Sequence, residues 1–392
     1  MIFVEEAVAR CLALVQTLPS EEVSLADAAG RWLAQPVTAL RDQPPFPASA
    51  MDGYAVPGDP APGETLRVVG EAGAGHAFAG TIGPGEALRI FTGAPVPSGA
   101  TRVLIQEDVK RDGDRITLKD GADIATHIRP QGQDFLTGTA VGPRLLRPND
   151  LALLAAMGIA RPRVTRRPVV ALIATGDEIK MPGEAVKPEQ IYASNLFALK
   201  AMIEAEGGTA RLLPIAHDRL EPLQTVLRLA EGADLIVTIG GASVGDHDLV
   251  GPAAEGLGLQ RAFWQIAMRP GKPLMAGRLG TSAMVGLPGN PVSAIVCGHL
   301  FVLPMIRAML GRPDVAPVAR IGELGCDLPA NGPRDHYMRA RLDAAGALPR
   351  LTPMARQDSS LLSVLTEADA LLIHPRHSGP MRPGDRVAYL PL

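Results

Sequence analysis

The sequence has few cysteines, few aromatic residues and no excess of positive charge. Only 3 of its 392 residues are cysteines, and Cys11, Cys297 and Cys326 are too far apart to form a CxxC or Cys/His cluster. This spacing excludes a zinc-finger-type site and is typical of a reducing cytoplasm. Aromatic residues make up 4% of the chain and the net charge is −3, so we do not expect a nucleic-acid partner.

A basic leader and a long apolar segment are also missing. The N-terminal stretch carries Glu5 and Glu6 where a signal peptide would be basic. The longest apolar run, AIVCGHLFVLPMI, is shorter than the roughly 20 residues that a bilayer requires. We therefore expect a cytoplasmic protein without a membrane partner.

The first third of the chain combines short helices with a β-rich region. Residues 4–18 have the apolar spacing of a helix, and we expect a second short helix over Leu25–Gln35. Alternating runs rich in glycine and proline over residues 46–140 predict a β-rich domain. A helix-forming stretch at 143–160 then returns the chain to the first domain, so the β-rich domain is an insertion.

From Pro168 onward, apolar strands alternate with helices, and this alternation predicts a parallel sheet covered on both faces. After about residue 313, strand-like runs such as ADALLIHP and DRVAYLPL predict a C-terminal β domain. The expected fold is therefore multidomain α/β plus β. We place an N-terminal helical domain at 1–45 and 141–167, the inserted domain at 46–140, the sheet domain at 168–313 and the C-terminal domain at 314–392.

Three loops at predicted carboxyl ends of parallel strands are rich in glycine. They are ATGDEI at 174–179, TIGGASVGDHD at 238–248 and VGLPGNPVSA at 285–294. Ligands of open α/β sheets bind at this edge, and glycine turns expose backbone N–H groups that bind phosphate. Each loop alone is equally well explained as a packing turn; their occurrence on one sheet favours a phosphate-bearing ligand. The candidate binding residues are Gly240, Gly241, Ser243, Gly245, Pro288, Gly289, Asn290 and Ser293.

Four acidic residues fall in loops at the same predicted edge: Glu178, Asp218, Asp246 and Asp248. Taken singly, each is equally consistent with a helix cap or a solvated loop. Together they predict a Mg²⁺ site, because magnesium takes one or two carboxylates plus phosphate oxygens. A metal would also explain why an acidic loop binds an anion.

Arg269 and Lys272, in the stretch MRPGKP, bring positive charge to this edge. We expect them to hold a second anion, although exposed loop residues of this type often have no such role. The stretch GASVG has the GxSxG spacing, but we do not expect a hydrolase with Ser243 as nucleophile. The absence of HExxH disfavours a zinc hydrolase.

The motifs PPFPASAMDGYAV, RIFTGAPVP, ATGDEI, TIGGASVGDHD, RPGKP and GLPGNPVSA occur in this order. In combination they resemble the molybdopterin molybdenumtransferase family, the bacterial MoeA proteins and the gephyrin E domain. The resemblance extends over essentially the whole chain. It implies a sheet domain with the molybdopterin-binding MogA/MoaB fold, a C-terminal β-barrel and an elongated helical part. It also implies that molybdenum from molybdate is inserted into adenylylated molybdopterin, with Mg²⁺-dependent release of AMP.

The resemblance assigns roles to individual residues. Asp52 of SAMDGYA, Thr92 of FTGAPVP and Asp134 of PQGQDF correspond to residues of the family's catalytic cleft. Without the resemblance, each would be an ordinary turn, strand-end or loop residue. The acids near the metal and the pyrophosphate correspond to Glu178, Asp218 and Asp248.

Arg339 and Ser359 correspond to the residues proposed for the family's molybdate site, with Ser360 as an alternative register for Ser359. Two positions depart from the pattern, since Gln265 and Arg269 stand where family members commonly carry lysine. Arginine at position 269 keeps the positive charge of a lysine but carries it on a planar guanidinium group, whereas glutamine at position 265 has no charge. This loss leaves open a non-catalytic carrier or scaffold for the pterin or the finished cofactor. A generic nucleotide pyrophosphatase is a third reading of the acids and glycine loops.

The resemblance also implies partners. It implies a homodimer whose active site combines domains of both subunits. It further implies transfer of the product to apo-molybdoenzymes, or exchange with the adenylyltransferase that makes the substrate.

Overall fold

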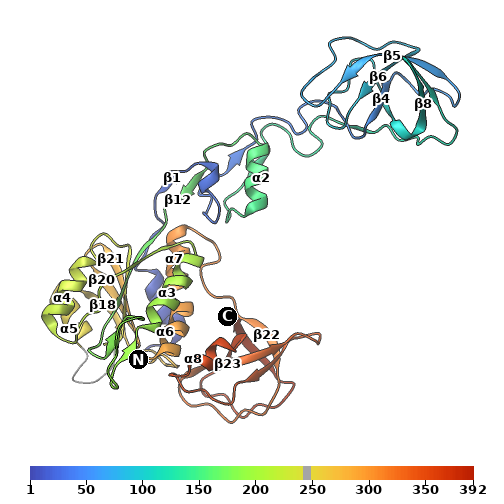
Figure 1. The fold of residues 1–392 in the computed structure, drawn as a ribbon. Helices are drawn as coiled ribbons and strands as arrows, with labels where there is room; N and C mark the ends of the chain where they lie inside the picture. The colour runs from blue at the N-terminus through green and yellow to red at the C-terminus, as the bar shows by residue number, and fades with distance from the viewer. Residues whose placement is uncertain (242–248) are drawn as a thin grey trace. The chain divides into compact units, whose positions relative to one another are not determined.

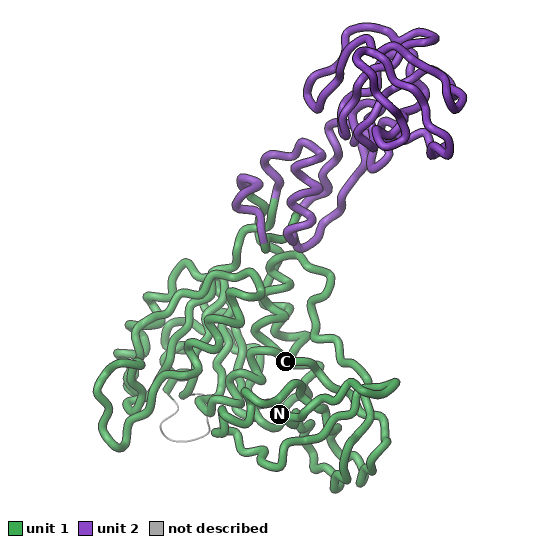
Figure 2. The backbone as a smooth tube through the Cα atoms, turned by 45° about the vertical axis from the view of Figure 1, so that its right-hand side comes forward, with its two compact units in different colours: residues 1–21, 30–34, 164–392 green, residues 22–29, 35–163 purple. Residues whose placement is uncertain are grey.

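The computed structural model describes residues 1–241 and 249–392, and it divides into two compact units (Figure 2). Unit 1 comprises Met1–Glu21, Gly30–Ala34 and Val164–Leu392, whereas unit 2 comprises Glu22–Ala29 and Gln35–Arg163. Each unit has its own apolar clusters and is described by itself. The boundaries of the four expected domains stay predictions.

Unit 2 is built around a six-stranded sheet with the strand order β7-β4-β6-β5-β9-β8 (Figure 1). Successive residues of β4 enter different apolar clusters: Tyr54 and Val56 pack with Ile116, whereas Ala55 packs with Ile90. Side chains of a strand alternate in this way when both of its faces are covered. The β-rich insertion is therefore confirmed. Its strands are β4 (Gly53–Val56), β5 (Thr65–Ala72), β6 (Glu86–Ile90), β7 (Arg102–Ile105), β8 (Val109–Asp112) and β9 (Arg115–Leu118).

The segments that lead into and out of this sheet form short ladders more often than helices. The helix expected over Leu25–Gln35 is wrong, because only the turn Leu25–Asp27 is helical. Gly30 has a φ of 68°, a left-handed conformation that ends a helix. The short elements are β1 (Ser20–Glu22), η1 (Leu25–Asp27), β2 (Val37–Thr38), β3 (Ala48–Ser49), η2 (Gln106–Asp108), β10 (Ile128–Arg129), β11 (Ala140–Val141), α2 (Pro148–Ala156) and β12 (Arg163–Thr165).

Unit 1 contains the predicted α/β sheet, with the order β16-β13-β17-β21-β20-β18. β16, β13, β17 and β21 are parallel, as expected. β20 runs antiparallel to both of its neighbours, because the two-residue connection from Leu279 to Ser282 is too short for a crossover. The strands are β13 (Val169–Ala174), β16 (Thr209–Leu212), β17 (Leu235–Ile239), β18 (Gln260–Trp264), β20 (Met275–Leu279) and β21 (Ser282–Leu287).

Helices cover both faces of this sheet (Figure 1). One apolar cluster joins the sheet to α1, α3, α6 and α7, and a second joins the opposite face to α4 and α5. The ladder β14–β15 lies beside the sheet. These elements are α1 (Val4–Leu12), β14 (Ile179–Lys180), β15 (Ile191–Tyr192), α3 (Ser194–Ala205), α4 (Leu220–Leu229), α5 (Val250–Glu255), α6 (Pro291–Cys297), the π-helical η3 (Gly298–Val302) and α7 (Leu303–Leu310).

The continuous helix Pro291–Leu310 is long and apolar enough to cross a membrane by length and composition, but 78% of its apolar window is buried inside the protein. Its burial identifies it as a core helix of unit 1.

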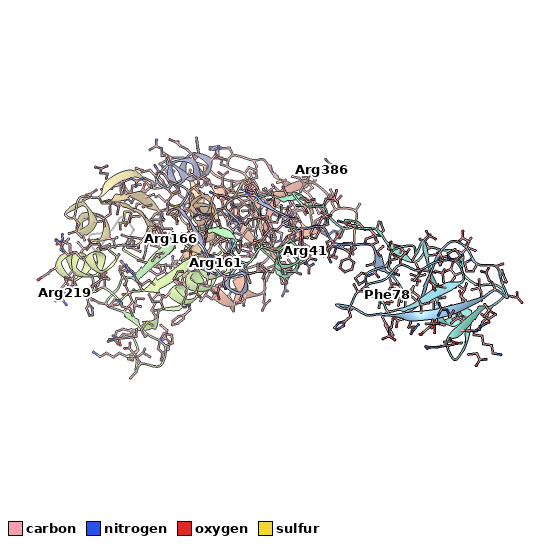
Figure 3. All side chains as sticks on the ribbon, turned by 90° about the horizontal axis from the view of Figure 1, so that it is seen from above. Arg41, Phe78, Arg161, Arg166, Arg219 and Arg386 are labelled. Carbon is pink, nitrogen blue, oxygen red and sulfur yellow. The ribbon has the colours of Figure 1, made fainter. Side chains whose placement is uncertain are left out.

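A partly buried ion pair ties together the amino-terminal ends of two strands of the sheet. The guanidinium of Arg166, labelled in Figure 3, donates two hydrogen bonds of 3.0 and 2.7 Å to the carboxylate of Asp234. The backbone N–H of Val169 donates a third, of 2.8 Å, to the same carboxylate. These bonds hold the start of β13 against the start of β17, so the carboxyl ends of both strands also lie together.

The C-terminal part of unit 1 is a closed barrel. Its strands follow the order β23-β24-β22-β26-β25, and the pairing of β25 with β23 closes the circle. Met338 and Leu372 point into the barrel core, whereas Tyr337 and Leu371 pack into the core of the α/β sheet. The predicted β-barrel is confirmed. Its elements are β19 (Met268–Arg269), which extends the barrel beside β23, β22 (Arg320–Leu324), β23 (Asp335–Asp343), β24 (Arg350–Pro353), α8 (Leu362–Thr366), β25 (Ala370–His374) and β26 (Arg386–Pro391).

Candidate functional site

A cavity of about 650 Å³ opens at the carboxyl ends of β13 and β17. β16, the next strand of this sheet along the chain, lies on one side of β13, and the following strand, β17, lies on its other side. The direction in which strands are added to the sheet therefore reverses between β13 and β17. Such a switch point is where open α/β sheets bind their ligands. Thr175 and Ile239 line the cavity from the two strand ends, and Ile191 and Tyr192 form an apolar wall from β15.

Two glycine turns form one side of this cavity. Gly240 has a φ of 96°, and a Cβ there would lie 2.8 Å from the carbonyl oxygen of Thr175. Gly241 has a φ of 60°, and its Cβ would lie 2.5 Å from Cγ2 of Val250. Both positions therefore require glycine, and both line the cavity together with Pro288, Gly289 and Asn290, as the glycine motifs predict.

Two of the predicted metal-binding acids, Glu178 and Asp218, line the same cavity. A Cβ on Gly176 would lie 2.5 Å from Oε2 of Glu178, so this glycine leaves the space that the carboxylate occupies. Among the described residues, no group of three histidine, cysteine or acidic side chains could hold a metal ion. Two carboxylates still suffice for Mg²⁺, which completes its shell with phosphate oxygens and water.

The loops that carry these two acids are tied together by neighbouring residues. Asp177 accepts a hydrogen bond of 2.7 Å from Nδ1 of His217. This bond is the main reason why the pKa of Asp177 lies below its ordinary value. Because Asp177 precedes Glu178 and His217 precedes Asp218, the bond positions both carboxylates at the cavity. The sequence analysis did not identify this pair, since the two residues lie 40 positions apart.

Four predicted residues, Ser243, Gly245, Asp246 and Asp248, lie outside the described residues. Their assignment stays a prediction.

The C-terminal domain reaches the cavity through the segment around Ser359. Nδ2 of Asn290 donates a 3.2 Å hydrogen bond to the Ser359 hydroxyl, and the Ser359 carbonyl accepts one of 3.1 Å from the Val292 N–H. Ser360, the alternative register, lines the cavity itself. Asn195, in the first turn of α3, donates a 2.8 Å bond to the Gly289 carbonyl and so fixes the second glycine turn.

The remaining basic and polar candidates of unit 1 do not converge on the cavity. Lys272 is exposed next to the lining residue Pro273, and Ser293 is buried within α6. Arg339 is only 1% exposed, and its Nη2 donates a 3.2 Å bond to the Arg356 carbonyl. Burial lowers the pKa of Arg339.

Arg269 also lies away from the cavity lining. Its Nη2 is 2.6 Å from Nδ1 of His336 on the C-terminal barrel.

In unit 2, Asp52 and Thr92 form a pair. The backbone N–H and the hydroxyl of Thr92 donate bonds of 2.7 and 2.8 Å to Oδ1 of Asp52. These two bonds, helped by the nearby charge of Arg89, hold the pKa of Asp52 below its ordinary value. Asp134 and Arg129 line a second cavity, of about 570 Å³, within unit 2. The structure thus brings Asp52 to Thr92 and Asp134 to Arg129.

Comparison with known proteins covers nearly the whole chain. Residues 2–158 match the family described as the MoeA N-terminal region (domain I and II). Residues 171–308 match the probable molybdopterin binding domain, and residues 322–392 match the MoeA C-terminal region (domain IV).

Named relatives are similar over most of their length. A molybdopterin molybdenumtransferase 2 of Mycobacterium tuberculosis is 36% identical over 368 residues, which are 90% of this chain and 90% of that protein. A molybdopterin molybdenumtransferase of Nostoc is 33% identical over 391 residues, 95% of this chain and 89% of that protein. The solved structure of a molybdopterin biosynthesis moeA protein from Pyrococcus horikosii is 29% identical, with a TM-score of 0.84 over 100% of this chain and 99% of that chain. With these matches over the fold and motifs described above, the chain belongs to the MoeA family of molybdopterin molybdenumtransferases.

Proposed function

We propose that this protein inserts molybdenum from molybdate into adenylylated molybdopterin and releases AMP. The observation that carries the proposal is the switch-point cavity, which combines two glycine turns with the carboxylates of Glu178 and Asp218. The turns suit a phosphate group, and the carboxylates suit the metal ion that accompanies it. The reaction itself, transfer of molybdenum to molybdopterin, is proposed from the names of the relatives.

The chain's own groups have distinct roles in this proposal. The backbone N–H groups of Gly241 and Gly289 bind the phosphate end of the pterin nucleotide, since no side chain blocks them, whereas the Gly240 N–H donates to the Leu287 carbonyl and fixes the turn. Asn195 holds the Gly289 peptide in a fixed orientation through its bond to the carbonyl. The apolar wall of Ile191 and Tyr192 excludes water from one side of the ligand.

Glu178 and Asp218 would hold Mg²⁺, with Asp246 or Asp248 as further candidates. The fit rests on the position of Glu178 and Asp218 in one cavity and on the space that Gly176 leaves for a carboxylate. Bound there, Mg²⁺ would neutralise the charge that develops on the phosphate oxygens during cleavage.

We further propose that the protein acts in the cytoplasm as a homodimer, as the family resemblance implies. In that dimer, Asp52, Thr92 and Asp134 of one subunit would face the cavity of the other and position a water molecule or the metal. The resemblance assigns molybdate to Arg269, Lys272, Arg339 and Ser359, although Arg269 and the buried Arg339 do not line the cavity of this structure. The product would then pass to apo-molybdoenzymes.

Release of AMP from adenylylated molybdopterin by the purified protein tests the proposal. We expect AMP release that requires Mg²⁺ and is stimulated by molybdate, with a product that activates an apo-molybdoenzyme. Chelation of the metal with EDTA should stop the reaction. Release without any effect of molybdate would instead identify a nucleotide pyrophosphatase, and pterin binding without release would identify a carrier.

Replacing Thr92 with valine tests the role of Asp52. The substitution removes the hydroxyl bond to Oδ1 of Asp52 but keeps the backbone bond, so the pKa of Asp52 should rise towards its ordinary value. We expect turnover to fall roughly tenfold with little change in substrate affinity, because general acid–base positioning of this kind contributes to the chemical step. Steady-state AMP release gives both quantities.

The matched control is Thr117→Val, an exchange in the same domain that removes only a bond to the Thr65 hydroxyl. Equal turnover in Thr92→Val and Thr117→Val would remove Asp52 and Thr92 from the catalytic machinery.

A further inference from the structure

Arg89, on β6 of unit 2, holds its guanidinium group over two aromatic rings. β4 and β6 are neighbours in the sheet, and their register places Arg89 directly opposite Tyr54 (Figure 1). The guanidinium carbon lies 5.1 Å from the centre of the Tyr54 ring and 4.6 Å from the centre of the Phe91 ring. Tyr54 is only 4% exposed, so it forms a fixed support. Stacking of this kind holds a planar guanidinium group in one orientation.

Two hydrogen bonds connect this guanidinium group to the main chain around Asp52. Nη1 donates a bond of 3.1 Å to the carbonyl of Gly53, the residue that follows Asp52. Nη2 donates a bond of 2.9 Å to Oε1 of Gln106. The backbone N–H of Gln106 in turn donates a bond of 3.0 Å to the Asp52 carbonyl. Arg89 therefore reaches Asp52 by two routes, through its neighbour in the chain and through its hydrogen-bond partner.

The carboxylate of Asp52 is bound through one oxygen only. Oδ1 accepts both bonds from Thr92, whereas in the described part of the chain Oδ2 accepts none. The strand that follows Asp52 cannot shift easily, because a Cβ on Gly53 would collide with the Leu104 carbonyl and only glycine allows this close approach. With Oδ1 fixed by Thr92 and the main chain fixed through Arg89, the direction of Oδ2 is also fixed.

The effect of Arg89 on Asp52 is mainly geometric. Both of its acceptors are neutral groups, a carbonyl and a primary amide, and among the described residues Arg89 forms no ion pair. Its charge lowers the pKa of Asp52, but the two bonds from Thr92 lower this pKa more. Loss of Arg89 should therefore disturb the orientation of the carboxylate more than its state of ionisation.

We propose that Arg89 is a positioning residue, which holds Asp52 so that Oδ2 is presented to the water molecule or the metal in the reaction. This inference rests on the proposed function, in which Asp52 belongs to the catalytic cleft. Arg89 acts only through Gly53 and Gln106. Lysine could not take its place, because a planar guanidinium group directs separate nitrogen atoms at two acceptors, whereas an ammonium group has a single nitrogen.

A double-mutant cycle with Asp52 in the full chain tests this role. We expect Arg89→Gln to lower kcat for AMP release from adenylylated molybdopterin roughly tenfold and to change KM by less than about twofold, because a misplaced group affects the chemical step. In the Asp52→Asn background the same exchange should cause no further loss, since no carboxylate is left to position. Arg89→Lys keeps the charge over the two rings, in case Arg89→Gln does not fold, and should also lower kcat.

Arg67→Gln is the matched control. Arg67 lies on the neighbouring strand β5, its side chain is 60% exposed, and it forms an ion pair with Glu86 on β6. This variant should retain the kcat of the wild type. Hydrogen exchange supplies a measurement that needs no activity: the Gln106 amide should exchange faster in Arg89→Gln than in the wild type or in Arg67→Gln, while the core strands of the sheet keep their protection.

The outcomes separate this inference from the proposed function. Equal losses from Arg89→Gln with and without the Asp52 carboxylate would overturn the inference, because a general structural defect lowers both rates. Wild-type turnover in Arg89→Gln or Arg89→Lys would overturn it as well. A wild type that releases no AMP would contradict the proposed function. In that case, faster exchange of the Gln106 amide in Arg89→Gln would still support the link between Arg89 and Asp52, and unchanged exchange would overturn it.

Discussion

Glu178→Gln should lower molybdate-dependent AMP release by roughly 100-fold or more. The exchange keeps the size of the side chain, so its packing against Gly176 is retained, but it removes one of the two described carboxylates that face the cavity. Loss of a group that stabilises developing charge typically lowers kcat by about 10²–10³-fold. Affinity for AMP should change less, because the glycine turns that bind phosphate are intact. Initial rates measured against Mg²⁺ concentration give the metal requirement directly.

Glu189→Gln is the control for this experiment. Glu189 is an exposed acid 11 positions further along the same loop region and does not line the cavity. It should retain the rate and the Mg²⁺ requirement of the wild type. If Glu178→Gln and Glu189→Gln behaved alike, Glu178 would have no role in metal binding, and the metal would have to be held by Asp218 with the acids of residues 242–248.

The switch-point cavity could be predicted because its determinants are local in the sequence. Gly240 and Gly241 follow directly after a buried strand, and their positive φ angles need the glycines that the motif supplies. Glu178 and Asp218 also follow strands of the same sheet. Parallel strands place their carboxyl ends at one edge, so the alternation of strands and helices is enough to bring these residues together.

The basic residues could not be grouped from the sequence, because their positions depend on long-range pairing. Arg269 and Arg339 correspond to one molybdate site by resemblance, yet the register of β23 places Arg339 level with Leu371 and His336 level with Arg269. A change of one position along a strand moves a side chain to the other face. The register of β23 against β19 and β25 is fixed only when the barrel closes, and no sequence motif indicates it.

Two features of the fold were missed for different reasons. The contact from Asn195 to the Gly289 carbonyl joins residues 94 positions apart, so no local pattern in the sequence indicates it. A helix was expected over Leu25–Gln35, but only Leu25–Asp27 is helical and Gly30 adopts a left-handed conformation. The first contact leaves no signal in the local sequence, whereas the second feature is a local stop signal, because a left-handed glycine ends a helix.

Glu206→Gln should destabilise unit 1 by about 3 kcal/mol, through the loss of a largely buried charge. The carboxylate of Glu206, which is 11% exposed, accepts two bonds of 2.9 Å from Arg307 and one of 2.5 Å from Arg312. Glutamine keeps the shape but leaves two partly buried guanidinium groups without their shared counter-ion. Arg312 retains Asp314, which limits the loss.

The expected result is a fall of roughly 6–12 °C in the unfolding temperature of unit 1, given its size. Glu204→Gln provides the comparison, because Glu204 lies in the last turn of α3, is 43% exposed and, among the described residues, pairs only with Lys200. An exposed pair at this spacing contributes about 0.3–0.5 kcal/mol, so its loss should shift the transition by no more than about 2 °C. Equal shifts for the two variants would mean that water reaches the Arg307 and Arg312 guanidinium groups freely. AMP binding should survive in both variants below the transition, since neither glutamate lines the cavity, and this separates stability of the unit from the chemistry of its site.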